Sequence, residues 1–108
     1  MKTTRSVNPR QLGTLLGDWR LGTGGPAYTR LATAITQLVL DGRLPLHCRL
    51  PSERDLAAAL GVSRTTVTAG YDALRETGYL VSQRGSGSWT ALPAVHRAVV
   101  PTWATAPV

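Results

Sequence analysis

The strongest constraint on the fold of this chain is a pair of helical patterns separated by only three residues. The stretch "SERDLAAALGVSRTTVTAGYDAL" starts at Ser52 and holds a second serine, Ser63, before its second pattern. A serine at the cap position accepts a hydrogen bond from a backbone N–H of the first helical turn. Gly61 stands between the patterns, and glycine readily takes the left-handed conformation that ends a helix. The sequence therefore predicts two helices joined by a short turn.

Both predicted helices have one apolar face. Ser52 and Asp55 have the spacing of a capping box at the first helix, and Val62 and Val67 that of a hydrophobic staple at the second. The inner face of the first helix is apolar: Leu56, Ala57 and Leu60. The inner face of the second holds Val67, Tyr71 and Leu74, which lie within about 60° of one another at helical spacing. Gly78 is expected to end this helix.

Further elements are expected on both sides of the helix pair. Pro9–Trp19 carries Leu12, Leu15, Leu16 and Trp19 at the spacing of a short leading helix. The first main helix is expected to run to Asp41 and Gly42, with one apolar stripe: Tyr28, Leu31, Ile35, Leu38 and Val39. After Gly78, "YLVSQ" and "WTA" are typical of two strands, with "RGSGS" as the turn of a hairpin between them.

The predicted fold class is mainly α with a small β-hairpin (α+β), in the order helix, helix, turn, helix, hairpin. Residues 1–27 are expected to form an N-terminal tail and a leading helix, and residues 28–92 one domain. Residues 93–108 contain three prolines and many small residues without a period, and we expect a linker or a disordered tail there.

The charge balance favours a polyanionic partner. The chain of 108 residues has eleven arginines, one lysine and six acidic residues, a net charge of +6. Nucleic acid fits this excess, and an anionic membrane surface remains an alternative. No apolar run approaches the roughly 20 residues of a membrane span, and no signal peptide is apparent, so a cytoplasmic location is expected. Cys48 is the single cysteine, which predicts neither an internal disulfide nor a zinc site.

The helix pair has the helix-turn-helix arrangement, in which the second helix enters the major groove of DNA with its N-terminal residues leading. Here that end begins with Ser63, Arg64, Thr65 and Thr66. Hydroxyl and guanidinium groups donate to phosphates and reach base edges, and small side chains allow a close approach. The backbone amides of the first turn add further donors for a phosphate. These residues are therefore candidates for contact with DNA.

The arginines differ in whether an acidic residue stands near them on the same helix. Arg75 follows Asp72 by three positions, so we expect a pair within the helix rather than contact with DNA. Arg54 and Arg64 have no acidic residue three or four positions away, and both stand in first turns, where the helix dipole disfavours a cation. This placement suggests an external anion. Arg84, at the hairpin tip, is a further candidate for contact with DNA.

Other residues have a structural alternative. Capping alone explains Ser52, and Ser63 is expected both to cap the helix and to be a candidate for contact with DNA. Thr65, Thr66 and Thr68 are mediocre helix formers, which favours a functional role for Thr65. Gly70 in mid-helix indicates close helix packing. Trp89 is expected to cover the core rather than stack on a base.

The stretch "LPSERDLAAALGVSRTTVTAGYDALRETGYLVSQRGSGSW" and the upstream "YTRLATAITQLVLDGRLPLHCRLPS" resemble the winged helix-turn-helix head of GntR family transcriptional regulators. The ending "GYLVSQRGSGSW", the "GYD" and the leading "LLGDW…GPAYTRL" resemble in particular the MocR subfamily. Members of that subfamily join this head by a linker to a large aminotransferase-like domain that binds pyridoxal phosphate. The resemblance implies a repressor or activator that binds repeated half-sites in double-stranded DNA as a homodimer.

The resemblance also implies a set of DNA-binding residues: Arg54, Ser63, Arg64, Thr65, Thr66, Thr68, Arg84 and Gly85. Two positions depart from the family pattern. Thr68 stands where the family often has an arginine, and Gly70 where alanine or arginine is usual. The base preference that position 68 contributes is therefore not implied.

An enzyme is not expected. A pyridoxal phosphate enzyme holds its cofactor on a lysine, and the only lysine here is Lys2, in a polar stretch without a phosphate cup. No cofactor is expected in this chain, and pyridoxal phosphate would belong to a further C-terminal domain. The alternative to a DNA-binding domain is a winged-helix module that binds RNA or a protein partner.

Overall fold

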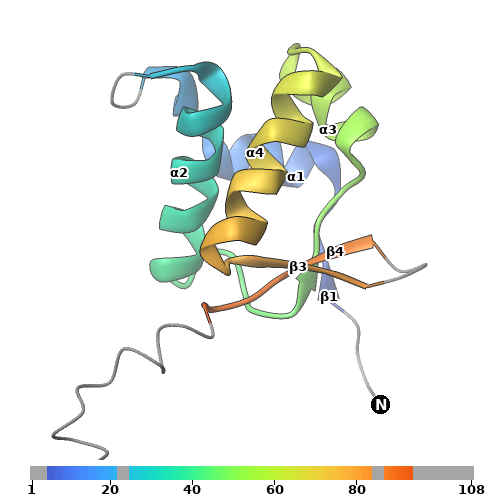
Figure 1. Ribbon diagram of the computed structural model, residues 1–108. Coiled ribbons are helices and arrows are strands. Elements are labelled where there is room, and N and C mark those ends of the chain that lie inside the picture. Colours follow the sequence, from blue (N-terminus) through green and yellow to red (C-terminus); the bar gives the residue numbers. More distant parts are fainter. Residues whose placement is uncertain (1–4, 22–24, 84–86, 94–108) are drawn as a thin grey trace, which may run out of the picture.

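The structure, a computed structural model, describes residues 5–21, 25–83 and 87–93. It contains four α-helices and one short 3-10 helix, η1: α1 (Pro9–Leu16), η1 (Trp19–Leu21), α2 (Ala27–Leu40), α3 (Glu53–Leu60) and α4 (Arg64–Thr77). The strands are β1 (Arg5–Ser6), β2 (Cys48–Arg49), β3 (Leu80–Gln83) and β4 (Gly87–Thr90). Figure 1 shows α4 between α2 and α3, with the hairpin of β3 and β4 below it. This arrangement confirms the predicted mainly α fold with a small sheet.

Helix α4 is the centre of the core. The apolar residues predicted for its inner face, Val67, Tyr71 and Leu74, are all buried. A Cβ atom at Gly70 would lie 3.2 Å from Leu31 Cδ2 and 3.4 Å from the Tyr28 carbonyl oxygen. The close packing predicted from this glycine is therefore confirmed, and α2 is its partner.

One member of the predicted stripe on α2 is not buried. Leu31, Ile35, Leu38 and Val39 face the core as expected, whereas the Tyr28 side chain is 39% exposed. Tyr28 stands in the first turn of α2, at the end of the helix. Tyrosine is amphipathic, so its partial exposure there costs little.

The turn between α3 and α4 forms as the sequence predicts. The Oγ atoms of Ser52 and Ser63 accept hydrogen bonds of 3.1 Å from the Asp55 and Thr66 backbone N–H groups. Gly61 ends α3 with a φ of 72°, in the left-handed region. Within the described residues, Asp55 returns no side-chain bond to Ser52, so the capping box is half formed. Gly78 ends α4, also as predicted.

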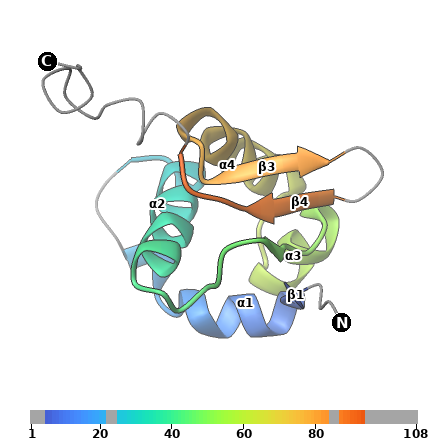
Figure 2. The ribbon, with the colours of Figure 1, turned by 90° about the horizontal axis from the view of Figure 1, so that it is seen from below.

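The sheet is larger than the predicted hairpin. Its strand order is β1-β2-β4-β3, with β1 parallel to β2 and the other neighbours antiparallel. Leu80 pairs with Thr90 and Gln83 with Gly87 in the hairpin, which Figure 2 shows from below. Strands β1 and β2 have two residues each, too few for an alternating pattern to reveal them in the sequence.

Trp89 does not cover the core in the way the sequence predicts. Its neighbours Ser88 and Thr90 are the buried residues of β4. Successive side chains of a strand point to opposite faces, so Trp89 lies on the outer face, where it pairs with Val81. The exposed fraction of Val81 is 44%. Trp89 itself is only half-buried, and the prediction is wrong because strand alternation outweighs the general preference of tryptophan for the core.

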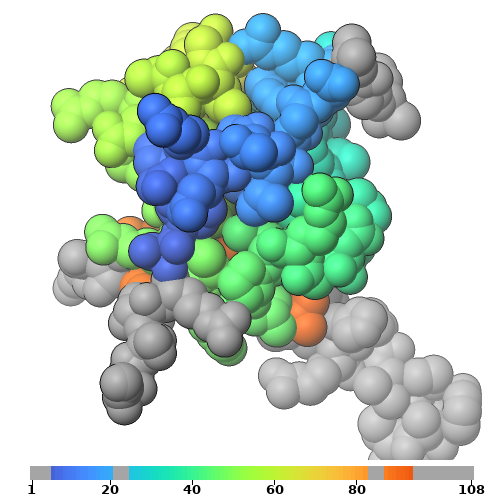
Figure 3. Space-filling view, turned by 180° about the vertical axis from the view of Figure 1, so that it is seen from behind, coloured from blue at the N-terminus to red at the C-terminus, as the bar shows by residue number. Residues whose placement is uncertain are grey.

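The leading segment supports the turn between α3 and α4. Seen from behind, α1 lies across the molecule next to α3 (Figure 3). Leu12, Leu16 and Trp19 are buried, which confirms the predicted leading helix, although its last turn is the separate η1. The Arg20 Nη2 atom donates hydrogen bonds to the Leu60 and Gly61 carbonyl oxygens, at 2.6 and 3.4 Å. The Arg30 Nη1 atom donates to the Arg20 carbonyl oxygen at 2.9 Å.

Candidate nucleic-acid interface

The first turns of α3 and α4 meet at one edge of the molecule. Ser52, Glu53, Arg54 and Arg64 line a shallow hollow of about 210 Å³ there. Arg54 and Arg64 are exposed, and within the described residues ion pairs are recorded for Arg75 alone. Two guanidinium groups without carboxylate partners thus stand where both helices have free backbone N–H groups. Cations and N–H donors at one place favour the binding of an anion.

The hydroxyl residues at the start of α4 differ in their bonds. Ser63 Oγ accepts from the Thr66 N–H and shares a 2.9 Å hydrogen bond with Thr66 Oγ1. Thr65 is exposed, and no hydrogen bond of its hydroxyl is recorded in the part of the chain that the structure describes. Thr65 therefore has a hydroxyl group available to an external partner, whereas Ser63 and Thr66 also stabilise the helix start.

Thr68 is engaged inside the domain. Its Oγ1 donates a 3.2 Å hydrogen bond to Glu53 Oε1, and the residue is half-buried between α3 and α4. The other carboxylate oxygen of Glu53 lies 3.8 Å from Arg75 Nη2. These contacts partly neutralise the one acidic group that lines the hollow.

Arg75 connects α4 to three other elements. Its Nη1 atom lies 2.6 Å from Asp72 Oδ1, which confirms the predicted pair within α4. Its Nε donates to Ser82 Oγ at 2.6 Å and its Nη2 to Ser88 Oγ at 3.1 Å. With the contact to Glu53, Arg75 therefore ties α4 to both strands of the hairpin and to the start of α3.

Tyr71 holds α4 against the entry to α3. Its hydroxyl donates a 2.7 Å hydrogen bond to the Pro51 carbonyl oxygen. Burial raises the pKa of the Tyr71 phenol well above its usual range, and the Glu53 carboxylate raises it further, against the opposing effect of Arg75. The phenol therefore remains a neutral donor at neutral pH, and its hydrogen bond joins the middle of α4 to the segment that leads into α3.

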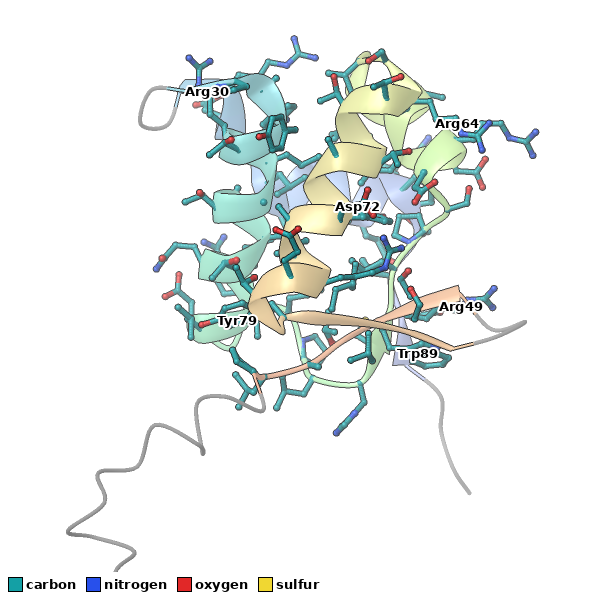
Figure 4. All side chains as sticks on the ribbon, in the orientation of Figure 1. Arg30, Arg49, Arg64, Asp72, Tyr79 and Trp89 are labelled. Atoms are coloured by element: carbon teal, nitrogen blue, oxygen red, sulfur yellow. The ribbon has the colours of Figure 1, made fainter. Side chains whose placement is uncertain are left out.

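Two predicted site residues, Arg84 and Gly85, lie outside the described residues. The structure instead places a further cation at this edge, Arg49, which no local signal in the sequence indicates. Arg49 extends from β2 toward the same side of the molecule as Arg64 (Figure 4). No local sequence pattern indicates the position of Arg49, because that position depends on the pairing of β2 with β4 through Arg49 and Trp89.

Two helices are linked by a short turn, a hairpin follows the second helix, and arginines without an ion pair among the described residues lie along one edge. These features define a winged helix-turn-helix DNA-binding domain. The sequence pattern described as "Bacterial regulatory proteins, gntR family" matches residues 27–89. The chain belongs to this family. It is a DNA-binding domain of a transcriptional regulator and not an enzyme, as the sequence predicts.

Curated relatives share the same part of the chain. The HTH-type transcriptional regulator Rv0792c of Mycobacterium tuberculosis is 43% identical over 77 residues, which cover 70% of this chain and 29% of that protein. The probable rhizopine catabolism regulatory protein MocR of Rhizobium meliloti is 46% identical over 66 residues, or 61% of this chain and 13% of that protein. The chain thus spans less than a third of the length of these two relatives.

Solved structures show the same fold. YtrA from Sulfolobus acidocaldarius, a GntR-family transcription factor, has a TM-score of 0.62 and 29% identity, covering 80% of this chain and 90% of that one. The DNA-binding domain of AraR in complex with operator ORR3 has a TM-score of 0.56 and 29% identity, covering 66% of this chain and 88% of that one.

None of the helices in the described ranges is both long and apolar enough to cross a membrane.

Proposed function

We propose that α4 enters the major groove of an operator with Arg64 and Thr65 leading, while α3 crosses the backbone and Arg54 contacts a phosphate. The exposure of Arg54 and Arg64 at the two helix starts, without ion-pair partners among the described residues, carries this proposal. Arg64 begins α4, where a guanidinium can donate to guanine O6 and N7. Arg54 lies in α3, the helix that crosses the DNA backbone, so its contact is expected to be with a phosphate.

The other predicted site residues take supporting roles in this proposal. Ser63 and Thr66 order the first turn of α4 and present hydroxyls to the phosphates next to it. Thr68 acts through Glu53, which its hydroxyl contacts, more than through a base. Arg84 and Gly85 would place the hairpin tip on the backbone or in the minor groove.

The regulator to which this domain belongs is proposed to be of the MocR type. The identity to MocR of Rhizobium meliloti over the DNA-binding domain supports this assignment. Pyridoxal phosphate would then bind to an aminotransferase-like domain and not to the residues described here. Two copies of the domain would bind two half-sites about one helical turn apart, as dimeric helix-turn-helix proteins do.

Titrations of Arg64→Ala and Arg54→Ala on operator and scrambled duplexes at several salt concentrations test the proposal. The Arg64→Ala variant should lose about 1 to 3 kcal/mol on the operator and distinguish it less well from scrambled DNA. The Arg54→Ala variant should weaken both duplexes by similar factors. It should also make the slope of log K against log salt shallower by about 0.9, the value for one phosphate contact.

An unchanged salt slope for Arg54→Ala, or an equal loss on both duplexes for Arg64→Ala, would show that these roles are wrong. Duplex RNA and a single strand complete the comparison. Equal binding of the domain to duplex DNA, duplex RNA and the single strand would count against the proposal that α4 reads the major groove of DNA.

A further inference from the structure

A second hollow continues the first one toward the hairpin. The hollow at the helix starts and a neighbouring hollow of about 230 Å³ share Ser52 and Glu53 in their linings. The second hollow extends past Tyr71 to Arg49 of β2 and to Gly87 of β4. Together they form one groove, with Arg54 and Arg64 at one end and Arg49 at the other.

The backbone of Arg49 is held from both sides. Its carbonyl oxygen accepts a 3.0 Å hydrogen bond from the Val7 N–H, and it pairs with Trp89 of β4. The next residue, Leu50, donates to the Ser88 carbonyl oxygen at 2.9 Å. The backbone from which the Arg49 side chain extends is therefore already fixed between β1 and β4, so little backbone freedom is lost when the side chain binds a ligand.

The Arg49 guanidinium lies against the start of β4. A Cβ atom at Gly87 would be only 3.1 Å from Arg49 Nε, and the φ of Gly87 is 94°, so both the close approach and the left-handed backbone favour a glycine at this position. Arg49 is exposed, and neither ion pair recorded among the described residues involves it. The one carboxylate in the groove, Glu53, is already engaged by Thr68 and Arg75. The groove thus presents unneutralised positive charge at both ends.

We propose that Arg49 binds a backbone phosphate of the DNA duplex, between the contacts of Arg54 and those of the hairpin. A guanidinium donates two parallel hydrogen bonds to a phosphate, and the groove gives one DNA strand a continuous path from the helix starts to β4. This inference rests on the proposed DNA-binding function. It adds a strand residue to the helix and hairpin residues as a phosphate-binding group.

The test compares Arg49→Ala with Arg43→Ala in the full chain. Both variants lose one positive charge, but Arg43 lies beside α1, where it lines a different hollow with Arg10 and Thr14. We expect Arg49→Ala to weaken binding about tenfold at low salt on operator and scrambled duplexes alike, with a salt slope shallower by about 0.9. The Arg43→Ala variant should change neither quantity by a comparable amount.

Arg49→Lys provides a second measurement. It keeps the charge without the planar pair of donors, so the salt slope should return to that of the unmodified chain while affinity recovers only in part. Thermal unfolding of each variant without DNA checks that the fold is retained. Because Arg43 and Arg49 are both exposed, we expect the unfolding temperature to change little. Equal effects of Arg49→Ala and Arg43→Ala would overturn the inference. If instead the unmodified chain or Arg64→Ala fails the operator test, the proposed function itself fails.

Discussion

The two ends of α4 use arginine in opposite ways. At the N-terminal end, Arg64 is exposed and has no ion pair within the described part of the chain. Near the C-terminal end, Arg75 contacts Asp72, Glu53 and the two hairpin serines. The same side chain is therefore available to an external anion at one end and serves internal structure at the other. The residues around each arginine therefore determine whether it is free to bind an anion or is engaged within the domain.

Apolar packing follows the same division. Tyr71 and Leu74 are essentially inaccessible to solvent, whereas Arg64 and Thr65 at the start of the helix are exposed. We therefore expect substitutions of the buried residues of α4, from Val67 onward, to change stability, and substitutions of the exposed residues at its start to change DNA binding. Three variants test this division, from the largest expected effect to the smallest.

Leu74→Ala should lower the free energy of unfolding by about 2 to 5 kcal/mol, because the Leu74 side chain is completely buried and its truncation leaves a cavity. Urea unfolding followed by circular dichroism measures the change. Arg64→Ala is the matched variant from the other end of α4, and it should leave the unfolding midpoint almost unchanged. A comparable loss of stability in both variants would contradict the division of α4 into buried residues that stabilise the fold and exposed residues that bind DNA.

Arg75→Met should lower the free energy of unfolding by about 1 to 2 kcal/mol. Methionine retains much of the apolar volume, but the Asp72 and Glu53 carboxylates lose their partner and the hairpin loses two hydrogen bonds to α4. Arg43→Met controls for the loss of one charge at an exposed site. Chemical unfolding measures the free energy of unfolding of both variants. Equal values for Arg75→Met and Arg43→Met would show that the contacts of Arg75 contribute no more to stability than a surface charge does.

Tyr71→Phe should cost about 1 kcal/mol at neutral pH, since the Pro51 carbonyl oxygen loses its donor. The variant should also change the response to alkaline pH. Burial raises the pKa of the Tyr71 phenol above that of the unfolded chain, near 10. Below that pH both states keep the proton. Above it only the unfolded state releases the proton, so stability falls as pH rises.

Replacing Tyr71 with phenylalanine removes this contribution, and stability should decline less steeply between pH 9 and 11, about the range set by the usual tyrosine pKa. Tyr28→Phe is the control, because the Tyr28 side chain is 39% exposed. Unfolding curves at intervals of pH give the slope for each variant. Parallel slopes for Tyr71→Phe and the unmodified chain would exclude the buried phenol as the source.

Local signals in the sequence were sufficient for most of the fold. Ser52, Ser63, Gly61 and Gly78 fix the helix boundaries through interactions within a few residues, and the structure confirms each of them. The helical apolar period identified the core for the same reason, because it depends on local geometry alone. Fold class and family could therefore be predicted from the sequence.

The parts that were missed depend on contacts between distant residues. Strands β1 and β2 pair residues about 43 positions apart, Arg5 with Cys48 and Ser6 with Arg49, and nothing in either dipeptide indicates its partner. The face occupied by Trp89 depends on the register of β4. Within the candidate site, Arg54 and Arg64 could be predicted because they stand in the first turns of two recognisable helices. The position of Arg49 could not, because it depends on the pairing of β2 in the sheet.

The bonds of Arg20 support the helix pair from outside the part of the chain that the family pattern matches. Arg20 lies before residue 27, where the match to the gntR pattern begins, yet its guanidinium holds the carbonyl groups at the end of α3. Arg20 therefore stabilises the turn from a segment that the gntR pattern does not cover. A fragment cut to the limits of that pattern would keep both helices of the pair and lose two of the hydrogen bonds that hold the turn between them.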